Sequence, residues 1–302
     1  MIDPKAITTY AQYNEDLILL ALLHDVEAGF YVDVGANYPI VDSVTKLFYD
    51  KGWIGINIEP IESLYKQFLE TRPKDINLRY GAGKAAGKAT LREYTDISGH
   101  STFNAEQKKQ HDKSLKYTDY EVDIRALKEI FEEYKIKHIH FLKIDVEGFE
   151  YEVVAGNDWT KYRPEVVCIE ANHESRNWQQ IIEKNKYRFF IADGLNEYYV
   201  ADEAWQRTNG FAERIIGIDY HALKQHQRQS WAQDSKAIEE LSRMAAVQEG
   251  TIKASHRKIQ ELELVASLSL KNRPFRSRLK RSVYGLTVDW VKYRRGASKQ
   301  DR

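Results

Sequence analysis

Acidic side chains stand at the ends of several apolar runs in this sequence. Asp145 and Glu147 follow the run at residues 138–144, while Glu170 and Glu59 each end another run. Carboxylates in such places can accept hydrogen bonds from sugar hydroxyls, take a proton from a reacting group or bind a divalent cation. In an open α/β sheet, ligands bind outside the carboxyl ends of the strands. We therefore expect these carboxylates to share one crevice.

Another apolar run, at residues 30–34, is followed by a loop with a single glycine. Asp33, Gly35 and Asn37 would meet Glu59 at the same edge of the sheet, and Glu59 comes 24 residues after Gly35, where nucleotide-binding folds place an acid on a ribose diol. A dinucleotide site needs three glycines in G-x-G-x-x-G, and Asp33 would repel a pyrophosphate. The loop is better suited to a nucleoside that carries a cationic group.

Alternating apolar runs and helical patterns predict the elements that position these side chains. A strand at 30–34, a helix capped by Ser43 and a strand at 53–58 form a βαβ unit. Gly81 and Gly83 interrupt the chain after the third strand, and the polar stretch 95–119 predicts a long loop. The further predicted elements are helices at 10–26, 63–70 and 125–134, strands at 76–80, 89–94, 138–144 and 165–171, a helix around Trp178, and a closing hairpin at 187–191 and 197–200.

Five stretches in order carry a resemblance: YAQYNEDLILL, VDVGANYPIVDSVTKLF, GINIEP, FLKIDVEGFEYEVVAG and ADGLNEYYVADE. From about Tyr10 to Glu203 the chain resembles the FkbM-type family of S-adenosylmethionine-dependent methyltransferases. The resemblance implies an α/β class I methyltransferase fold, which is a Rossmann-like seven-stranded sheet with an antiparallel last strand. It also implies S-adenosylmethionine as methyl donor and a hydroxyl as acceptor, often on a sugar or glycan and sometimes on a polyketide.

The cofactor residues that we expect come from the glycine loop and the tips of the next two strands. In the family, the loop after the third strand lies near adenine, although here it lacks the acid that such loops often carry. The predicted cofactor-binding residues are Asp33, Gly35, Ala36, Asn37, Ser43, Glu59, Pro60 and Gly83.

Transfer to a hydroxyl needs a group that removes its proton, because a sugar hydroxyl is a poor nucleophile. We expect Asp145, Glu147 or His173 to act there, although Glu147 can instead stabilise the start of the following helix. Asp145, Glu170 and Asn172 offer three oxygen ligands for Mg²⁺. The Ser-Thr stretch 100–102 either faces the acceptor or is a solvated loop.

The composition changes near the end of the chain. We expect a methyltransferase domain at residues 10–222 and a helical, basic C-terminal extension at 223–302. Residues 253–302 carry 14 Lys and Arg against 4 Asp and Glu, a charge of +10 that leaves −10 on the rest of this net-neutral chain. An interrupted heptad pattern at 238–269 predicts a long helix that packs on the domain or pairs two copies into a homo-oligomer. The aromatic and basic mixture at 275–295 suits peripheral contact with an anionic membrane or with a glycan-assembly partner.

Composition narrows the remaining classes of protein. No run approaches about 20 apolar residues, and the first residues lack a signal-peptide pattern, so we expect a cytoplasmic protein, with the tail able to reach the inner membrane face. Cys168, the only cysteine, lies in an apolar run and predicts a buried packing residue. The acidic domain, without an N-P-P-[YF]-like motif, makes nucleic acid an unexpected partner, and a small-molecule or glycan acceptor is expected. A nucleotide-binding module without catalysis, or a methyltransferase for another small molecule or nucleic acid, stays the alternative.

Overall fold

The computed structural model describes residues 7–94, 101–105, 107–108, 116–171, 177–219 and 223–224. These residues lie in the first of two compact units of the chain, Met1–Gln229. The helices are α1 (Glu15–Leu22), α2 (Lys46–Asp50), α3 (Glu62–Thr71), α5 (Leu127–Glu133), α6 (Glu150–Ala155), α7 (Trp178–Lys184), the 3₁₀ helix η3 (Asp202–Thr208) and α8 (Phe211–Asp219). The strands are β1 (Thr8–Thr9), β2 (Phe30–Val34), β3 (Ile54–Ile58), β4 (Ile76–Leu78), β5 (Gly81–Ala82), β6 (Gly87–Tyr94), β7 (Tyr117–Arg125), β8 (Phe141–Ile144), β9 (Val166–Glu170), β10 (Tyr187–Ala192), β11 (Asn196–Ala201) and β12 (Leu223–Lys224).

A seven-stranded sheet in the order β10-β11-β9-β8-β2-β3-β4 forms the centre of the fold. Strands β9, β8, β2, β3 and β4 are parallel to one another, and β11 runs antiparallel to both β9 and β10. The sheet is therefore mostly parallel with an antiparallel strand near one edge, as the sequence predicts. Within this sheet, β2 is the first strand along the chain. The chain then adds β3 and β4 on one side of β2 and crosses over to add β8 and β9 on the other side. The ends of β2 and β8 thus form the switch point at which such sheets bind ligands.

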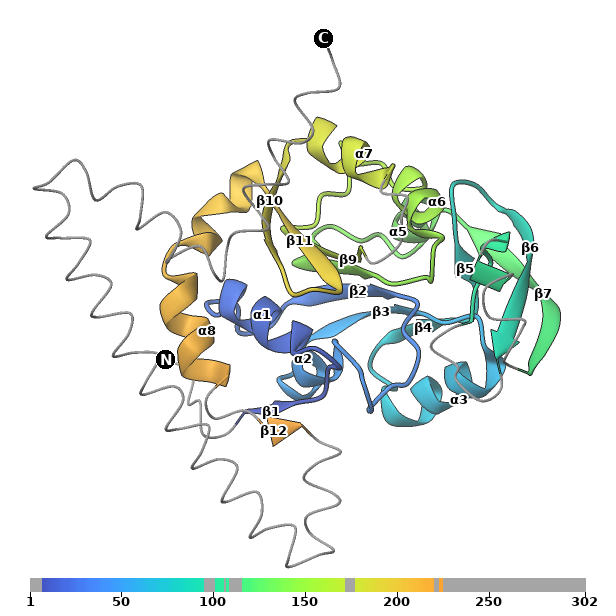
Figure 1. Ribbon diagram of the computed structural model, residues 1–302, viewed down its shortest axis with the longest axis horizontal. Helices are drawn as coiled ribbons and strands as arrows, with labels where there is room; N and C mark the ends of the chain where they lie inside the picture. The colour runs from blue at the N-terminus through green and yellow to red at the C-terminus, as the bar shows by residue number, and fades with distance from the viewer. Residues whose placement is uncertain are drawn as a thin grey trace, which may run out of the picture. The chain divides into compact units, whose positions relative to one another are not determined.

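Helices cover both faces of this sheet. Figure 1 shows α1, α2 and α3 on one face and α5, α6 and α7 on the other. Helix α8 packs on α1, where the Arg214 guanidinium donates to the carbonyl of Ala21 over 2.6 Å. Central strands enclosed in this way need apolar side chains on both faces, and every residue of β8 and β9 is buried. Cys168 is fully buried in β9, which confirms it as a packing residue.

A smaller sheet in the order β5-β7-β6 was only partly predicted. β7 pairs with β6 along the whole of β6, so the predicted loop at 95–119 was wrong at its end. Gly81 begins a short strand rather than a break. One face of β7 is solvated, and Val122 and Ile124 alternate with charged residues along the strand. Its other face packs Val122 and Ile124 on Leu64 of α3 and on Leu91.

Two predicted helix starts were also wrong. The first helix begins at Glu15 and not at residue 10, because the Asp16 carboxylate accepts bonds from the Thr9 hydroxyl and the Tyr10 amide and folds the preceding residues back. The second begins at Lys46, so Ser43 is not its cap.

Several predictions concern residues that the structure does not describe. The predicted 238–269 helix and the basic tail at 275–295 both belong to residues 225–302, which lie outside the described residues. Within the described residues, no helix has both the length and the apolar character needed to cross a membrane.

Candidate functional site

A cavity of about 400 Å³ opens at the carboxyl edge of the seven-stranded sheet. Many of the predicted site residues line it together, and others lie outside its walls. Those that line the cavity are Gly35, Asn37, Glu59, Pro60, Asp145, Glu147 and Glu170. Asp33, Ala36, Ser43 and Gly83 do not line it, while Asn172 and His173 lie outside the described residues. The shared crevice expected from the strand ends is therefore present.

Gly35 lets the ends of β2 and β8 approach closely. Its φ is +73°, a conformation that side chains rarely adopt, and a Cβ at this position would lie 1.8 Å from the carbonyl oxygen of Asp145. The Gly35 amide donates to the Ile58 carbonyl at 3.1 Å, which joins the loop to the end of β3 as well. Only glycine fits this junction of three strands.

Glu59 is held at the tip of β3 by backbone donors. Its two carboxylate oxygens accept hydrogen bonds from the amides of Asn37 and Ile61, each at 2.8 Å. The side chain is buried and lines the cavity. Burial raises the pKa of Glu59 to about 7, although the two backbone bonds and the nearby ammonium of Lys143 act in the opposite direction. A carboxylate fixed in this way keeps lone pairs with which to accept further hydroxyl donors.

Lys143 is a site residue that sequence reasoning missed. Its buried ammonium lies 3.0 Å from the Gly35 carbonyl, 3.4 Å from Asp33 and 3.3 Å from Asp145. Burial alone would lower the pKa of Lys143, but Asp145 and Asp33 outweigh it and raise the pKa. The signal was a lysine inside an otherwise apolar strand, one residue before the strand ends. The parallel register places it directly beside Asp33.

Asp33 and Ser43 support the loop from beneath the cavity. The Asp33 carboxylate accepts from the Thr45 hydroxyl at 2.8 Å, and the Ser43 hydroxyl accepts from the buried guanidinium of Arg72 at 2.6 Å. Arg72 also donates to Thr45 at 2.6 Å and to the carbonyl of Pro39. These contacts fix the course of the chain between β2 and α2.

Three carboxylates gather on the β8 and β9 side of the cavity. Oxygens of Asp145, Glu147 and Glu170 lie within 4.8 Å of one another. Burial, followed by the charges of Glu170, Asp145 and Glu150, raises the pKa of Glu147 to about 10. The donor set suits a hard cation such as Mg²⁺, which prefers carboxylate oxygens.

The start of the helix after Glu147 is stabilised by another residue, Glu150. Helix α6 begins at Glu150, whose carboxylate accepts from the amides of Val146 at 3.3 Å and Gly148 at 3.0 Å. Glu150 thus binds the exposed amides ahead of the helix, and Glu147 lines the cavity instead.

The chain that follows β4 contributes residues other than the predicted glycine to the cavity. The Gly83 amide donates to the Arg125 carbonyl at 3.0 Å, and the glycine packs closely against Gly156. Tyr80, Gly81 and Ala82 line the cavity in its place. In the Ser-Thr stretch, Ser101 lines the cavity, whereas residue 100 is not described.

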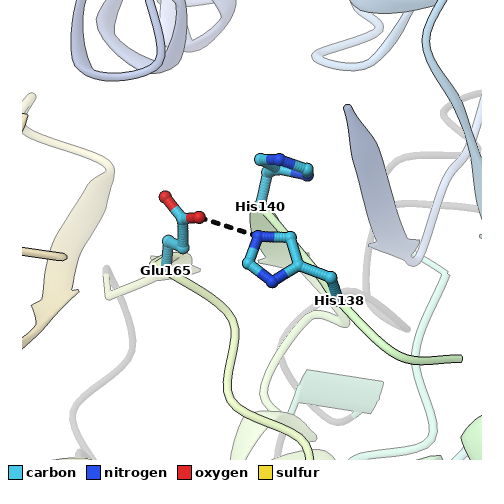
Figure 2. Close-up of side chains that lie close together, drawn as sticks. All are labelled: His138, His140 and Glu165. Carbon is cyan, nitrogen blue, oxygen red and sulfur yellow. Dashed lines mark hydrogen bonds and ion pairs between the residues drawn. The ribbon is translucent and has the colours of Figure 1, made fainter. Parts of the chain in front are cut away.

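A second group of potential ligands lies at the opposite, amino edge of the sheet. Figure 2 shows His138, His140 and Glu165, with Nε2 of His138 2.7 Å from Glu165. Nδ1 of His140 accepts from the Phe30 amide at 2.9 Å, so the proton of that ring is on Nε2. Glu165 is also paired with Arg207. A metal bound here would have to displace the contacts of Glu165 with His138 and with Arg207. The group is therefore better explained as a structural ion-pair network.

The mostly parallel sheet and the carboxylate-lined cavity at its switch point define an α/β protein with a ligand site at the carboxyl ends of its central strands. Residues 33–189, just over half of the chain, match the model of the methyltransferase FkbM domain. The protein therefore belongs to the FkbM methyltransferase family, as the sequence motifs indicate. Neither the curated proteins nor the solved structures give a match to this chain.

Proposed function

We propose that this protein is an S-adenosylmethionine-dependent O-methyltransferase that acts on a hydroxyl of a sugar or glycan. One observation carries the proposal: a single cavity has Glu59 on its β3 side and Asp145, Glu147 and Glu170 on its β8 and β9 side. The first is suited to a ribose diol and the second group to an acceptor hydroxyl. Family membership supports methyl transfer, and the assignment of donor and acceptor is our own.

The donor would occupy the half of the cavity formed by the β2 loop and the tip of β3. Glu59 would accept hydrogen bonds from the ribose hydroxyls, and the loop at Gly35 and Asn37 would lie against the amino-acid end. Tyr80 and Ala82 line the wall where the adenine is expected. Bound S-adenosylmethionine supplies an activated methyl group, so catalysis can rely largely on alignment of the acceptor.

Proton removal would fall to the acid group, and its three members are not equivalent. Asp145 lines the cavity, and its carboxylate lies 3.3 Å from the Lys143 ammonium. Glu147, with a pKa raised to about 10, holds its proton near neutral pH and is a hydrogen-bond donor there. We therefore assign the base to Asp145. A divalent cation held by Asp145, Glu147 and Glu170 would ionise the acceptor hydroxyl instead.

The charge of the cavity supports an uncharged acceptor group. Among its described lining residues one ammonium, Lys143, faces five carboxyl groups: Asp42, Glu59, Asp145, Glu147 and Glu170. A phosphate next to the transferred methyl group would be repelled, whereas carboxylates can accept hydrogen bonds from sugar hydroxyls. Nucleic acid is disfavoured as an acceptor on the same ground, and neutral sugars of a surface polysaccharide or a secondary metabolite fit best.

Calorimetry with S-adenosylmethionine tests the donor. Glu59→Ala should weaken binding ten- to a hundredfold, about 1.5–3 kcal/mol for a charge-assisted hydrogen bond. Glu62→Ala is the matched control, because that side chain is exposed three residues away and does not line the cavity. Absence of binding by the unmodified protein would refute the proposed function, and equal affinities of the Glu59 variant and the unmodified protein would refute the role of Glu59.

A screen with labelled S-adenosylmethionine tests the acceptor, using sugar nucleotides, lipid-linked glycans and RNA. Asp145→Asn should abolish transfer and leave donor affinity within a few fold, since Asp145 acts on the acceptor. Transfer that resists a chelator leaves base catalysis by Asp145, and loss of transfer that Mg²⁺ restores points to the cation. RNA as the preferred acceptor, or donor binding without any transfer, would favour the alternatives.

The C-terminal extension at 223–302 is proposed as the part that brings the domain to its acceptor. We propose that its basic residues contact an anionic membrane surface at the cytoplasmic face, and that the segment 238–269 pairs two copies. Full-length protein should sediment with anionic liposomes at low salt, and a chain that ends at Lys271 should not. Equal and weak sedimentation of both would favour a protein partner.

A further inference from the structure

The turn that carries Glu147 has an unusual backbone. Glu147 has a φ of +51° and Gly148 a φ of +89°, so two successive residues are left-handed. For glycine this conformation is accessible, but for a glutamate it is strained. Such a conformation persists only where the surroundings hold it, and it is often found at functional sites.

Two side chains from a distant segment hold this turn. The hydroxyl of Thr102 donates to the Glu147 carbonyl at 2.6 Å, and the amide of Asn104 donates to the Gly148 carbonyl at 2.7 Å. Thr102 is fully buried, and its hydroxyl also accepts from the backbone amide of Asn104 at 2.9 Å. Glu150 binds the amides of Val146 and Gly148, so the turn is held through backbone donors as well as through the two carbonyls.

The segment 101–104 alternates between two tasks. Ser101 and Phe103 line the cavity, whereas Thr102 and Asn104 bind the turn. The segment is itself anchored, because the backbones of Thr102 and Arg92 exchange two hydrogen bonds of 3.0 and 3.1 Å. These four successive residues therefore join the wall of the cavity to the Glu147 turn.

We propose that Thr102 and Asn104 are positioning residues, which hold the Glu147 turn in its left-handed form and so keep the Glu147 carboxyl beside Asp145 and Glu170. Through the alternation, contact of the acceptor with Ser101 and Phe103 is coupled to the placement of this acid. The inference rests on the proposed function, which supplies the acceptor, whereas the restraint on the turn is independent of it.

Hydrogen exchange of the amides at residues 145–150 tests the restraint without any substrate. Thr102→Val keeps the shape and removes the hydroxyl, so exchange there should be at least about tenfold faster. Thr102→Ser keeps the donor and should stay within about threefold of the unmodified protein. Thr90→Val is the matched control, because Thr90 is an exposed threonine of β6 in the adjoining sheet, and it should change nothing.

Asn104→Ala is the second variant, and it decides the matter if Thr102→Val does not fold. It should also speed exchange in the turn, since it removes the bond to Gly148. Unchanged exchange in whichever of these variants folds, or equal acceleration by Thr102→Ser and Thr102→Val, would overturn the proposal. The latter result would show that packing and not the hydroxyl holds the turn.

Kinetics separate positioning from a general loss of structure. With labelled S-adenosylmethionine and the acceptor panel described above, Thr102→Val should lower kcat at least about tenfold. The calorimetric Kd for S-adenosylmethionine should stay within about threefold, and Thr102→Ser should restore most of the rate. Normal kcat in Thr102→Val would overturn the positioning role. Absence of donor binding by the unmodified protein would instead refute the proposed function and leave the exchange result standing.

Discussion

At the scale of single residues, the site depends on charges that are buried in pairs and on acids whose pKa is shifted by burial. Glu59 accepts two backbone hydrogen bonds at the edge of the cavity, and Lys143 bridges Asp33 and Asp145. The two residues need different tests, because Glu59 is proposed to bind the methyl donor whereas Lys143 stabilises the folded domain.

Donor affinity should depend on pH through Glu59. Burial raises the pKa of Glu59 to about 7, so the free protein loses the carboxylate form as the pH falls below this value. Ribose hydroxyls donate to the charged form, and the Kd should therefore be about tenfold higher at pH 6 than on the plateau above pH 8. Calorimetry across this range measures it. Glu59→Gln should bind more weakly and without this step, and a flat profile in the unmodified protein would contradict the prediction.

Lys143→Met should destabilise the domain by roughly 3–5 kcal/mol, because it leaves a buried carboxylate of Asp33 without its cation. Urea unfolding measures this change. Lys161→Met is the control, since Lys161 is an exposed partner of Glu132 and its replacement should leave the unfolding free energy nearly unchanged. If the two variants prove equally stable, the buried ammonium is not holding the strand ends together.

At the scale of elements, the site depends on the close approach of β2 and β8. Gly35→Ala should disrupt this junction, because its Cβ would meet the carbonyl of Asp145 at 1.8 Å in a backbone conformation that alanine avoids. We expect a loss of more than about 2 kcal/mol in unfolding free energy, or loss of donor binding where the variant folds. Gly87→Ala is the control, since open space surrounds Gly87. Thermal unfolding and calorimetry of both variants provide the check.

At the scale of the whole molecule, buried acids make stability depend on pH. Burial raises the pKa of Glu15 to about 7 and that of Asp16 to about 6. Between their unfolded and folded pKa values the folded state binds more protons, so these groups lower the unfolding free energy as the pH rises from about 4 to 7. His140, whose pKa burial lowers, acts in the opposite direction. Glu15→Gln should therefore gain about 2–3 kcal/mol relative to the unmodified protein between pH 4.5 and 8. Urea titrations of both proteins at several pH values test this, and parallel curves would contradict it.

Sequence periodicity was sufficient for the elements that are buried on both faces. The strands that end at Val34, Ile58, Ile144 and Glu170 were predicted because each is a short apolar run, and a parallel sheet requires such runs. The convergence of Glu59, Asp145 and Glu170 followed from the same reasoning, since strand ends share one edge. β7 was missed because its alternation of Val122 and Ile124 with charged residues covers only a few positions, directly after the polar stretch 95–119.

What the tertiary structure decided were the contacts between residues far apart in the chain. Nothing local to Ser43 indicates that the guanidinium of Arg72 reaches it, or that Thr102 donates to Glu147 across 45 positions. The sequence by itself determined the family, the central strands and the acids at their ends, because periodicity and motif order are properties of the chain. Which acids face the cavity, and which cations and hydroxyls hold them there, depends on the register and packing that only folding establishes.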